Sequence, residues 1–285
     1  MARPFHGVRV SGIAGRVDND VIDRCSDLRV VLGSGAIFSH ATAARLWGMP
    51  LPEHVADDIH VLSANAAAVR RSGVVGWRRA GPLGDIRVHH GLPVSSPADT
   101  WVMLATMTAG RGGAIPPEWL VAVADFLLSG RRTRWGRETP LSTVDELRDS
   151  LSRHGSGRGA RPLSWAVERA RTPVDSPRES LLRLGLAREG LPEPEVQPAV
   201  MTAAGWRHPD LAYLDQLTLI EYLGDVHRTD RSTWLGDLER VQLFEDAGYR
   251  VILAAGDDAT DAGLPAFAAR VRRALARAES ARTAR

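Results

Sequence analysis

The sequence predicts a mixed α/β protein of two domains: an α+β N-terminal part that resembles a winged helix, and a C-terminal α/β core with a central mixed sheet. A length of 285 residues favours two domains over one. Hydrophobic residues make up 44% and charged residues 25%, as in globular proteins. Helical and alternating hydrophobic patterns follow one another along the chain. We expect one domain over residues 1–173 and a second over residues 174–285.

The first domain begins with short elements. Ser39 is placed to cap a helix and Gly48 to end it, and Pro97 follows two serines in the way that opens a helix. Alternating residues predict short strands. The expected elements are a helix over 36–48, strands over 58–62 and 84–89, and a helix from Pro97. This order fits a winged-helix-like reader of DNA, and it fits many other small folds.

The pattern stays helical up to a glycine-rich segment. Helices are expected over 118–128 and 143–151, where Glu146 follows Ser142 or Thr143 as in a capping box. Residues 152–162 contain three spaced glycines, but no apolar strand precedes them as a nucleotide loop requires. We therefore expect an arginine-rich linker over residues 152–173.

The second domain has a clearer pattern. Its expected elements are a helix over 176–189 that stops at Gly190, two strands within 208–224 around Asp215 and Gln216, a helix over 233–247, a strand over 249–253 and a last helix from about 265.

Composition excludes several chemistries. All 36 basic residues are arginine, which excludes the P-loop and Schiff-base mechanisms that need lysine. One cysteine, Cys25, cannot form an internal disulfide or a thiolate metal site. The uncharged run 32–44 is too short to span a bilayer, and the N-terminus lacks an apolar signal core. We expect a cytoplasmic protein without a membrane partner; the oligomeric state is not predicted.

Charge is unevenly distributed. Residues 1–173 hold 22 arginines and 16 acids, whereas residues 174–285 hold 14 arginines and 18 acids. Residues 131–172 hold 10 arginines and 5 acids, a local excess that suits a phosphate backbone and predicts DNA as a partner. A solvated linker and helix face fits this excess equally well. The eight tryptophans are scattered, which favours core or interface positions over a base-stacking platform.

Two acids are expected to face each other in the second domain. A hairpin turn centred on Asp215 and Gln216 places Asp210 directly opposite Glu221. Opposed like charges destabilise a hairpin, so a proton, an arginine or a divalent cation must offset them. Two carboxylates at this separation suit Mg²⁺. A solvated acid pair is the alternative, and Glu179 in the preceding helix has its own alternative as the third residue of a capping box.

These residues occur within longer strings that resemble a known family. The strings are SPRESLLRLGL around Glu179, LPEPEV over 191–196, and the run from Pro209 to Ile252 with Glu-Tyr-x-Gly-Asp-x-His. In this order, over about 174–276, they resemble the endonuclease-like domains related to the very-short-patch repair (Vsr) endonucleases of the PD-(D/E)xK superfamily. The strings FSHATAARLWGMPLP and VSSPADTWVMLA resemble an AbiEi-type antitoxin region.

The resemblance implies a set of roles. Asp210 and Glu221 would hold Mg²⁺ or Mn²⁺ with the backbone carbonyl of Tyr222, and Glu179 would contact the metal through water or orient it. The ion would polarise a phosphodiester and activate water. His227 would relay a proton or hold a phosphate oxygen.

One position departs from the family pattern. Leu223 stands where the superfamily has lysine or, in this subgroup, another acid, and leucine can neither ligate nor protonate. Arg228 or Arg231 would supply the missing cation and contact nucleic acid. Arg240 is a further candidate contact to DNA, although an ion pair with Asp237 three residues earlier is the simpler interpretation.

Two functions follow as hypotheses. The first is a metal-dependent DNA endonuclease that hydrolyses phosphodiester bonds, with Glu179, Asp210, Glu221 and His227 as catalytic residues. The second is a non-catalytic DNA-binding regulator of antitoxin type that keeps a degenerate nuclease fold. The target sequence, the strand preference and the choice of DNA over RNA are not predicted.

Overall fold

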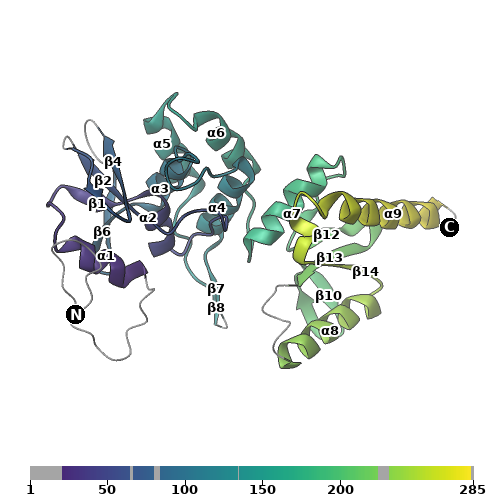
Figure 1. The fold of residues 1–285 in the computed structure, drawn as a ribbon. Coiled ribbons are helices and arrows are strands. Elements are labelled where there is room, and N and C mark those ends of the chain that lie inside the picture. The colour runs from purple at the N-terminus through teal and green to yellow at the C-terminus, as the bar shows by residue number, and fades with distance from the viewer. Residues whose placement is uncertain (1–20, 65–66, 80–83, 134, 224–230, 284–285) are drawn as a thin grey trace. The chain divides into compact units, whose positions relative to one another are not determined.

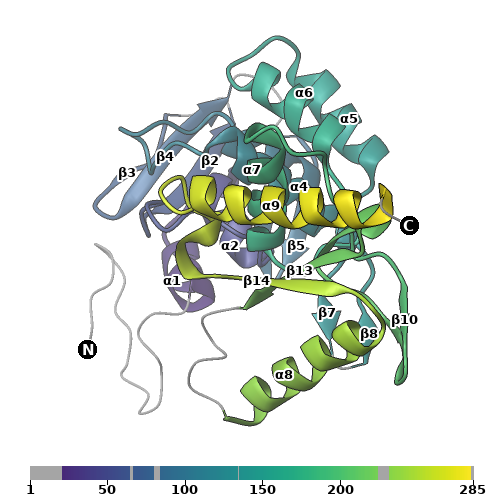
Figure 2. The same ribbon diagram turned by 90° about the vertical axis from the view of Figure 1, so that its right-hand side faces the viewer.

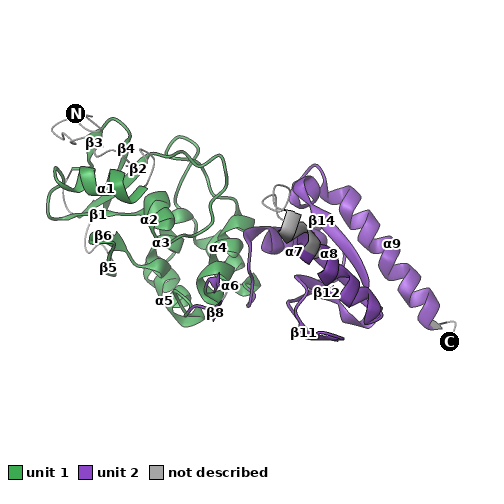
Figure 3. Cartoon of the chain, turned by 90° about the horizontal axis from the view of Figure 1, so that it is seen from below, with its two compact units in different colours: residues 1–130, 139–170 green, residues 131–138, 171–285 purple. Residues whose placement is uncertain are grey.

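The computed structural model describes residues 21–64, 67–79, 84–133, 135–223 and 231–283. The chain divides into two compact units (Figure 3). Unit 1 comprises residues 1–130 and 139–170, and unit 2 comprises residues 131–138 and 171–285. The division therefore lies three residues before the expected boundary, and the short segment 131–138 belongs to the second unit.

Unit 1 contains a six-stranded mixed sheet in the order β3-β4-β2-β1-β6-β5. Strands β2 and β4, and β1 and β6, pair in parallel, and the other neighbours are antiparallel. The sheet is larger than the two strands expected here. Its strands are β1 (Ala36–Phe38), β2 (Ile59–Ala64), β3 (Arg70–Arg71), β4 (Val74–Arg79), β5 (Ile86–His89) and β6 (Leu92–Ser95).

The helices of unit 1 begin where the sequence places their caps. Ser96 accepts a hydrogen bond from the amide of Asp99 at 3.3 Å, and Thr143 and Glu146 form the expected capping box. Residues 36–38 form a strand, so the helix after it is shorter than expected, and Ser39 holds the N-cap position without a capping hydrogen bond from its side chain. The helices are α1 (Val21–Arg29), α2 (His40–Leu46), α3 (Pro97–Leu104), α4 (Pro117–Ser129), α5 (Val144–His154) and α6 (Ala160–Arg169).

The arginine-rich linker expected over 152–173 is wrong, because helix α6 occupies its centre. Leu163 and Ala166 are fully buried on one side of this helix, so it packs as part of unit 1. Gly159 before it has a φ of 88°, and a Cβ there would lie 2.6 Å from the carbonyl oxygen of Ala105. The glycines that indicated flexibility therefore allow a tight turn between two packed helices.

Unit 2 is built around a four-stranded mixed sheet in the order β14-β13-β12-β9. β12 is antiparallel to both neighbours, whereas β13 and β14 are parallel and are connected through helix α8. Two hairpins, β7–β8 and β10–β11, lie outside this sheet. The elements are β7 (Arg132–Thr133), β8 (Gly136–Arg137), α7 (Pro177–Arg188), β9 (Glu195–Val196), β10 (Val200–Thr202), β11 (Gly205–Arg207), β12 (Leu211–Tyr213), β13 (Thr218–Leu223), α8 (Arg231–Asp246), β14 (Arg250–Ala255) and α9 (Leu264–Thr283).

Helices cover both faces of this sheet (Figures 1 and 2). Leu211, Ile220 and Ile252 pack in one cluster with residues of α7 and α9. Ala212 and Leu219, which alternate with them, pack with Phe244 of α8 on the opposite face. The acids Asp210 and Glu221 continue the second set by alternation, so both belong to the face that α8 covers.

The hairpin has the predicted register. Leu211 pairs with Ile220 and Tyr213 with Thr218, so Asp210 and Glu221 occupy the next opposed positions. The connection is a 3₁₀ turn over Leu214–Gln216 rather than a two-residue loop, but its centre is unchanged.

The helices and mixed sheets of the two units confirm the mixed α/β class. No helix in the described part of the chain combines the length and apolar character that crossing a bilayer requires.

Candidate acidic site

Asp210 and Glu221 line a cavity of about 210 Å³ at the end of the β12–β13 hairpin. Tyr222 donates its backbone N–H to Oδ2 of Asp210 at 2.7 Å, which continues the hairpin ladder through a side chain. A carboxylate has about four acceptor sites, so this bond leaves Asp210 capacity for a ligand in the cavity. The carbonyl of Tyr222 lies on the same side of the strand as its N–H, toward Asp210.

Arg240 from α8 pairs with Glu221. Its Nε lies 2.8 Å from Oε2 and its Nη2 lies 3.2 Å from Oε1, and Nη2 also donates to the carbonyl of His208. Phe244, one helical turn later, is fully buried on the sheet and fixes the helix. Arg240 therefore neutralises one of the two opposed acids, which is one of the resolutions that the sequence left open. The side chain of Asp237, its other expected partner, lies outside the described part of the structure.

Asp210 is the acid with the least compensation. Burial is the main cause that raises its pKa well above the ordinary value, followed by the negative charges of Glu179 and Glu221. The hydrogen bond from Tyr222 lowers this pKa, and the positive charge of Arg240 lowers it less. Asp210 and Glu221 thus line one cavity together with Arg132 and Arg240, and Glu179 adds a third interacting carboxylate. The favourable way to offset the repulsion at Asp210 is a proton or a cation.

Glu179 combines a helix-capping role with a place in this cluster. Its N–H donates to Ser176 Oγ at 3.3 Å, while its Oε2 accepts from the backbone N–H of Asp175 at 3.2 Å. The side chain is 4% exposed, and burial raises its pKa to about 7. The expected cap is confirmed in part, since the carboxylate caps the residue before Ser176, and it also raises the pKa of Asp210.

Gln197 is a residue of the site that the sequence reasoning missed. Its Nε2 donates to Oε2 of Glu179 at 3.1 Å, and its backbone N–H donates to the carbonyl of Asp210 at 3.1 Å. It is buried and adopts a left-handed φ of 45°, which costs a non-glycine residue about 1–2 kcal/mol. Gln197 therefore holds the acidic segments together, and no sequence pattern marks it.

His208, Asp175 and Arg132 were also missed, although all three line the cavity. Nδ1 of His208 lies 3.1 Å from the carbonyl of Gln197, and Nη1 of Arg132 lies 2.8 Å from Oδ2 of Asp175. His208 directly precedes the Pro-Asp pair and was a visible candidate. Arg132 lies 43 residues before Asp175, so only the tertiary structure brings it here.

The remaining predicted residues divide into two groups. Leu223, at the position where the resemblance implies lysine or another acid, lines the cavity beside Tyr222. Arg231 is the first residue of α8. His227 and Arg228 lie outside the described residues.

The donor set suits a metal held by two carboxylates. Within the described ranges, no three His, Cys, Asp or Glu side chains form a group that could hold a metal ion. Mg²⁺ needs only one or two carboxylates, and it keeps waters and substrate oxygens as other ligands. Asp210, Glu221 and the Tyr222 carbonyl meet this requirement if Glu221 binds the metal and Arg240 at the same time.

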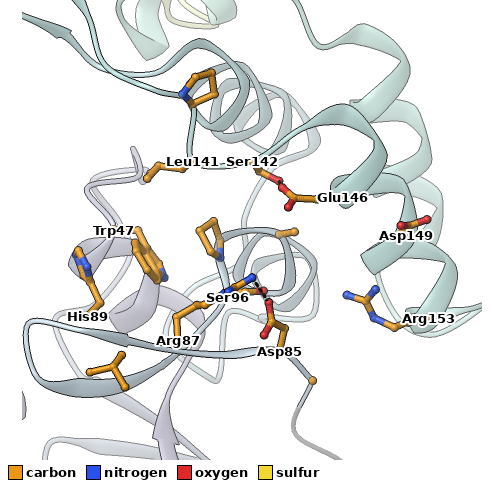
Figure 4. A pocket seen from close by; sticks show the side chains of 15 residues that line it. Trp47, Asp85, Arg87, His89, Ser96, Leu141, Ser142, Glu146, Asp149 and Arg153 are labelled. Atoms are coloured by element: carbon orange, nitrogen blue, oxygen red, sulfur yellow. Dashed lines mark hydrogen bonds and ion pairs between the residues drawn. The ribbon is translucent and has the colours of Figure 1, made fainter.

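A larger cavity, of about 870 Å³, lies in unit 1 (Figure 4). Trp47 stacks on His89 at one wall, and Arg87 pairs with Asp85 at 2.7 Å. Glu146, from α5, serves the capping box. These charged groups already have partners, whereas the acidic cavity of unit 2 concentrates the perturbed carboxylates, and that cavity is therefore the candidate site.

Comparisons with known proteins leave the family open. No protein-family model matches the sequence, and no curated protein or solved structure has significant similarity to it.

Proposed function

We propose that unit 2 is a metal-dependent phosphodiesterase that acts on DNA, with Asp210 and Glu221 as its metal-binding residues. The observation that carries the proposal is the opposed pair of Asp210 and Glu221 that lines one cavity, where burial and the charges of Glu179 and Glu221 raise the pKa of Asp210 well above its ordinary value. Like charges in a buried site repel, so a cluster of this kind destabilises the folded protein. Sites of this kind are typical of functional sites.

The order of elements in unit 2 supports the proposal. A helix that carries Glu179 precedes a mixed sheet, and the two opposed acids lie at the end of its central hairpin. The proposal interprets this arrangement as the restriction-endonuclease-like core that the resemblance to the Vsr-related domains implies. The acids approach each other through strand pairing, which holds them at a fixed separation.

The chain's own residues would prepare the site for a cation. Asp210 offers carboxylate oxygen to the cavity, Glu179 holds a proton near neutral pH, and Gln197 fixes both segments. Bound Mg²⁺ or Mn²⁺ would polarise the phosphodiester and lower the pKa of an attacking water. Arg240 would move from Glu221 toward a phosphate oxygen when the metal binds, since a guanidinium pairs with either anion.

A second candidate function is a non-catalytic DNA-binding regulator with the same fold. Two observations favour it: Leu223 stands in the cavity where the family has lysine or an acid, and Arg240 already neutralises Glu221. A site that carries its own arginine has less need of a metal. The regulator would bind DNA with a strong salt dependence, set by the number of phosphates that it neutralises.

A plasmid-nicking assay decides between these functions. The full chain is incubated with supercoiled plasmid in Mg²⁺, in Mn²⁺ and in a chelator, alongside the Asp210→Asn variant. Asp215→Asn is the matched control, because Asp215 lies exposed in the turn of the same hairpin. The nuclease predicts divalent-dependent nicking by the wild type and by the control, and none by Asp210→Asn.

Three results would reject the enzymatic proposal. They are no nicking by the wild type in either metal, equal nicking by Asp210→Asn, and nicking that persists in the chelator. Salt-dependent DNA binding by a protein that does not nick would then favour the regulator.

A further inference from the structure

The hairpin over residues 131–138, hereafter the basic hairpin, belongs to unit 2 although the chain on both sides of it belongs to unit 1. Its strands β7 and β8 pair Arg132 with Arg137 and Thr133 with Gly136. The chain thus leaves one unit, contributes a short arm to the other and returns. Closing a loop of this kind costs conformational entropy. We therefore expect the arm to have a role in unit 2.

Arginines anchor this arm at the acidic cavity. Arg132 and Arg137 both pair with the carboxylate of Asp175, at 2.8 Å and 2.5 Å, and together they lower its pKa despite partial burial. Arg137 also donates to Oε1 of Gln197 at 3.3 Å, and the amide of Gln197 donates in turn to Glu179. A continuous hydrogen-bonded network therefore joins the basic hairpin to the carboxylate cluster.

Trp135, at the tip of the basic hairpin, is 84% exposed. The sequence favoured core or interface positions for the tryptophans, and Trp101 is indeed fully buried, but Trp135 is not in any core. An exposed tryptophan keeps a large apolar face in water, and such faces are typical of binding surfaces. The two strands that lead to this tip pair Arg132 with Arg137, so the hairpin that carries the ring is basic.

We propose that the basic hairpin is the strand-binding arm of the acidic cavity: Arg132 contacts a phosphate of a nucleic-acid strand and Trp135 stacks on one of its bases. This inference rests on the proposed function, since it assigns the arm to the substrate of that site. Arg132 donates through Nη1 to Asp175, and a guanidinium has five donors, so it retains donors for a phosphate.

The spacing suits a single strand that runs past the cavity. Arg132 lines the cavity, and Trp135 lies three residues farther along the arm. Three extended residues span at most about 10 Å, and the chain reverses between Thr133 and Gly136, so Trp135 lies within that distance of Arg132. Stacked nucleotides of one strand rise about 3.4 Å each, so the stacked base would lie within about three nucleotides of the phosphate at Arg132. A protein partner would need complementary acids, whereas a nucleic acid supplies both the anion and the aromatic face in one molecule.

Binding measurements on the full chain test the arm separately from catalysis. A fluorescein-labelled single-stranded oligonucleotide and its blunt duplex are titrated in a chelator, and anisotropy gives Kd for the wild type and for Trp135→Ala, Trp135→Phe and Arg132→Ala. Trp206→Ala is the matched control, because Trp206 is also exposed, at 60%, on the other hairpin of unit 2.

The arm predicts that Trp135→Ala weakens binding about 5- to 150-fold, the range that one base stack produces. Trp135→Phe should retain most of the affinity, and Arg132→Ala should reduce the slope of log Kd against log salt by about one. Trp206→Ala should change Kd less than about twofold. A loss larger on the single strand than on the duplex places the stacked base in an unpaired segment, and an equal loss places it at a duplex end.

Several outcomes would overturn the proposal that the basic hairpin binds a nucleic-acid strand. They are no binding of either probe by the wild type, a change below about twofold for Trp135→Ala on both probes, and an equal loss in Trp206→Ala. The plasmid assay keeps the two proposals apart. Trp135-dependent binding without nicking would support strand binding by the basic hairpin and reject the nuclease function. Asp210-dependent nicking with unchanged Kd in Trp135→Ala would support the nuclease function and reject strand binding by the hairpin.

Discussion

Asp210 and Glu221 lie directly opposite each other at the end of the β12–β13 hairpin, and Arg240 pairs with only one of them. Both oxygens of Glu221 contact the guanidinium, whereas Asp210 accepts a hydrogen bond from the backbone of Tyr222. The two acids therefore differ in how their negative charge is compensated. Glu221 is paired with an arginine, whereas burial and the neighbouring acids raise the pKa of Asp210, so its charged form is costly unless a cation reaches the cavity.

Replacement of Arg240 by alanine should lower the free energy of unfolding by about 1–3 kcal/mol, because it leaves a nearly buried Glu221 without its counterion. Millimolar Mg²⁺ should restore more stability to Arg240→Ala than to the wild type, since the metal then neutralises both acids. Urea unfolding with and without Mg²⁺ measures the effect, with exposed Arg273→Ala as the control. Equal stabilisation of both proteins would contradict a metal at these carboxylates.

The Glu179→Gln variant should lose a pH dependence that the wild type has. The pKa of Glu179 is about 7 in the folded protein, against an ordinary value of 4.5, so the folded state binds more protons between these values. The free energy of unfolding therefore falls as pH rises from 4.5 to 7, by at most about 3 kcal/mol. Unfolding curves in a chelator should be flatter for Glu179→Gln and unchanged for exposed Glu195→Gln. Parallel curves for all three proteins would show that Glu179 is ionised throughout.

Two substitutions at Gln197 should separate its side chain from its backbone. Gln197→Ala removes the donor to the buried Glu179 and should cost about 1–3 kcal/mol of unfolding free energy. Gln197→Gly removes the same donor but relieves the left-handed φ of 45°, so it should be about 1 kcal/mol more stable than Gln197→Ala. Chemical denaturation of both variants compares them. A glycine variant less stable than the alanine variant would mean that the backbone there is not strained.

A lysine at position 223 should increase any nicking activity. Leu223 lines the cavity beside Asp210, and an ammonium group there would stabilise negative charge that develops on a phosphate. We expect Leu223→Lys to raise the nicking rate on the order of tenfold or more. Leu223→Met, which conserves volume, is the control. Equal rates for the two variants would mean that the position does not contact the reacting phosphate.

The sequence alone determined the elements whose signals are local. The capping box at Thr143, the stops at Gly190 and Gly248 and the opposition of Asp210 to Glu221 depend on neighbouring residues or on one turn, so their patterns are visible in the sequence. The helix over 160–169 was not predicted, because its glycine-rich approach imitates a flexible segment until tertiary packing is known.

Only the tertiary structure decided how the acids are compensated. Arg240 reaches Glu221 because the helix that carries it packs Phe244 on the sheet, and Gln197 reaches Glu179 through an irregular segment. Arg132 joins the site from a part of the chain that otherwise belongs to unit 1. Contacts between residues distant in sequence depend on which faces bury together, and local patterns do not encode them. The sequence thus determined which acids oppose each other, and the fold decided what surrounds them.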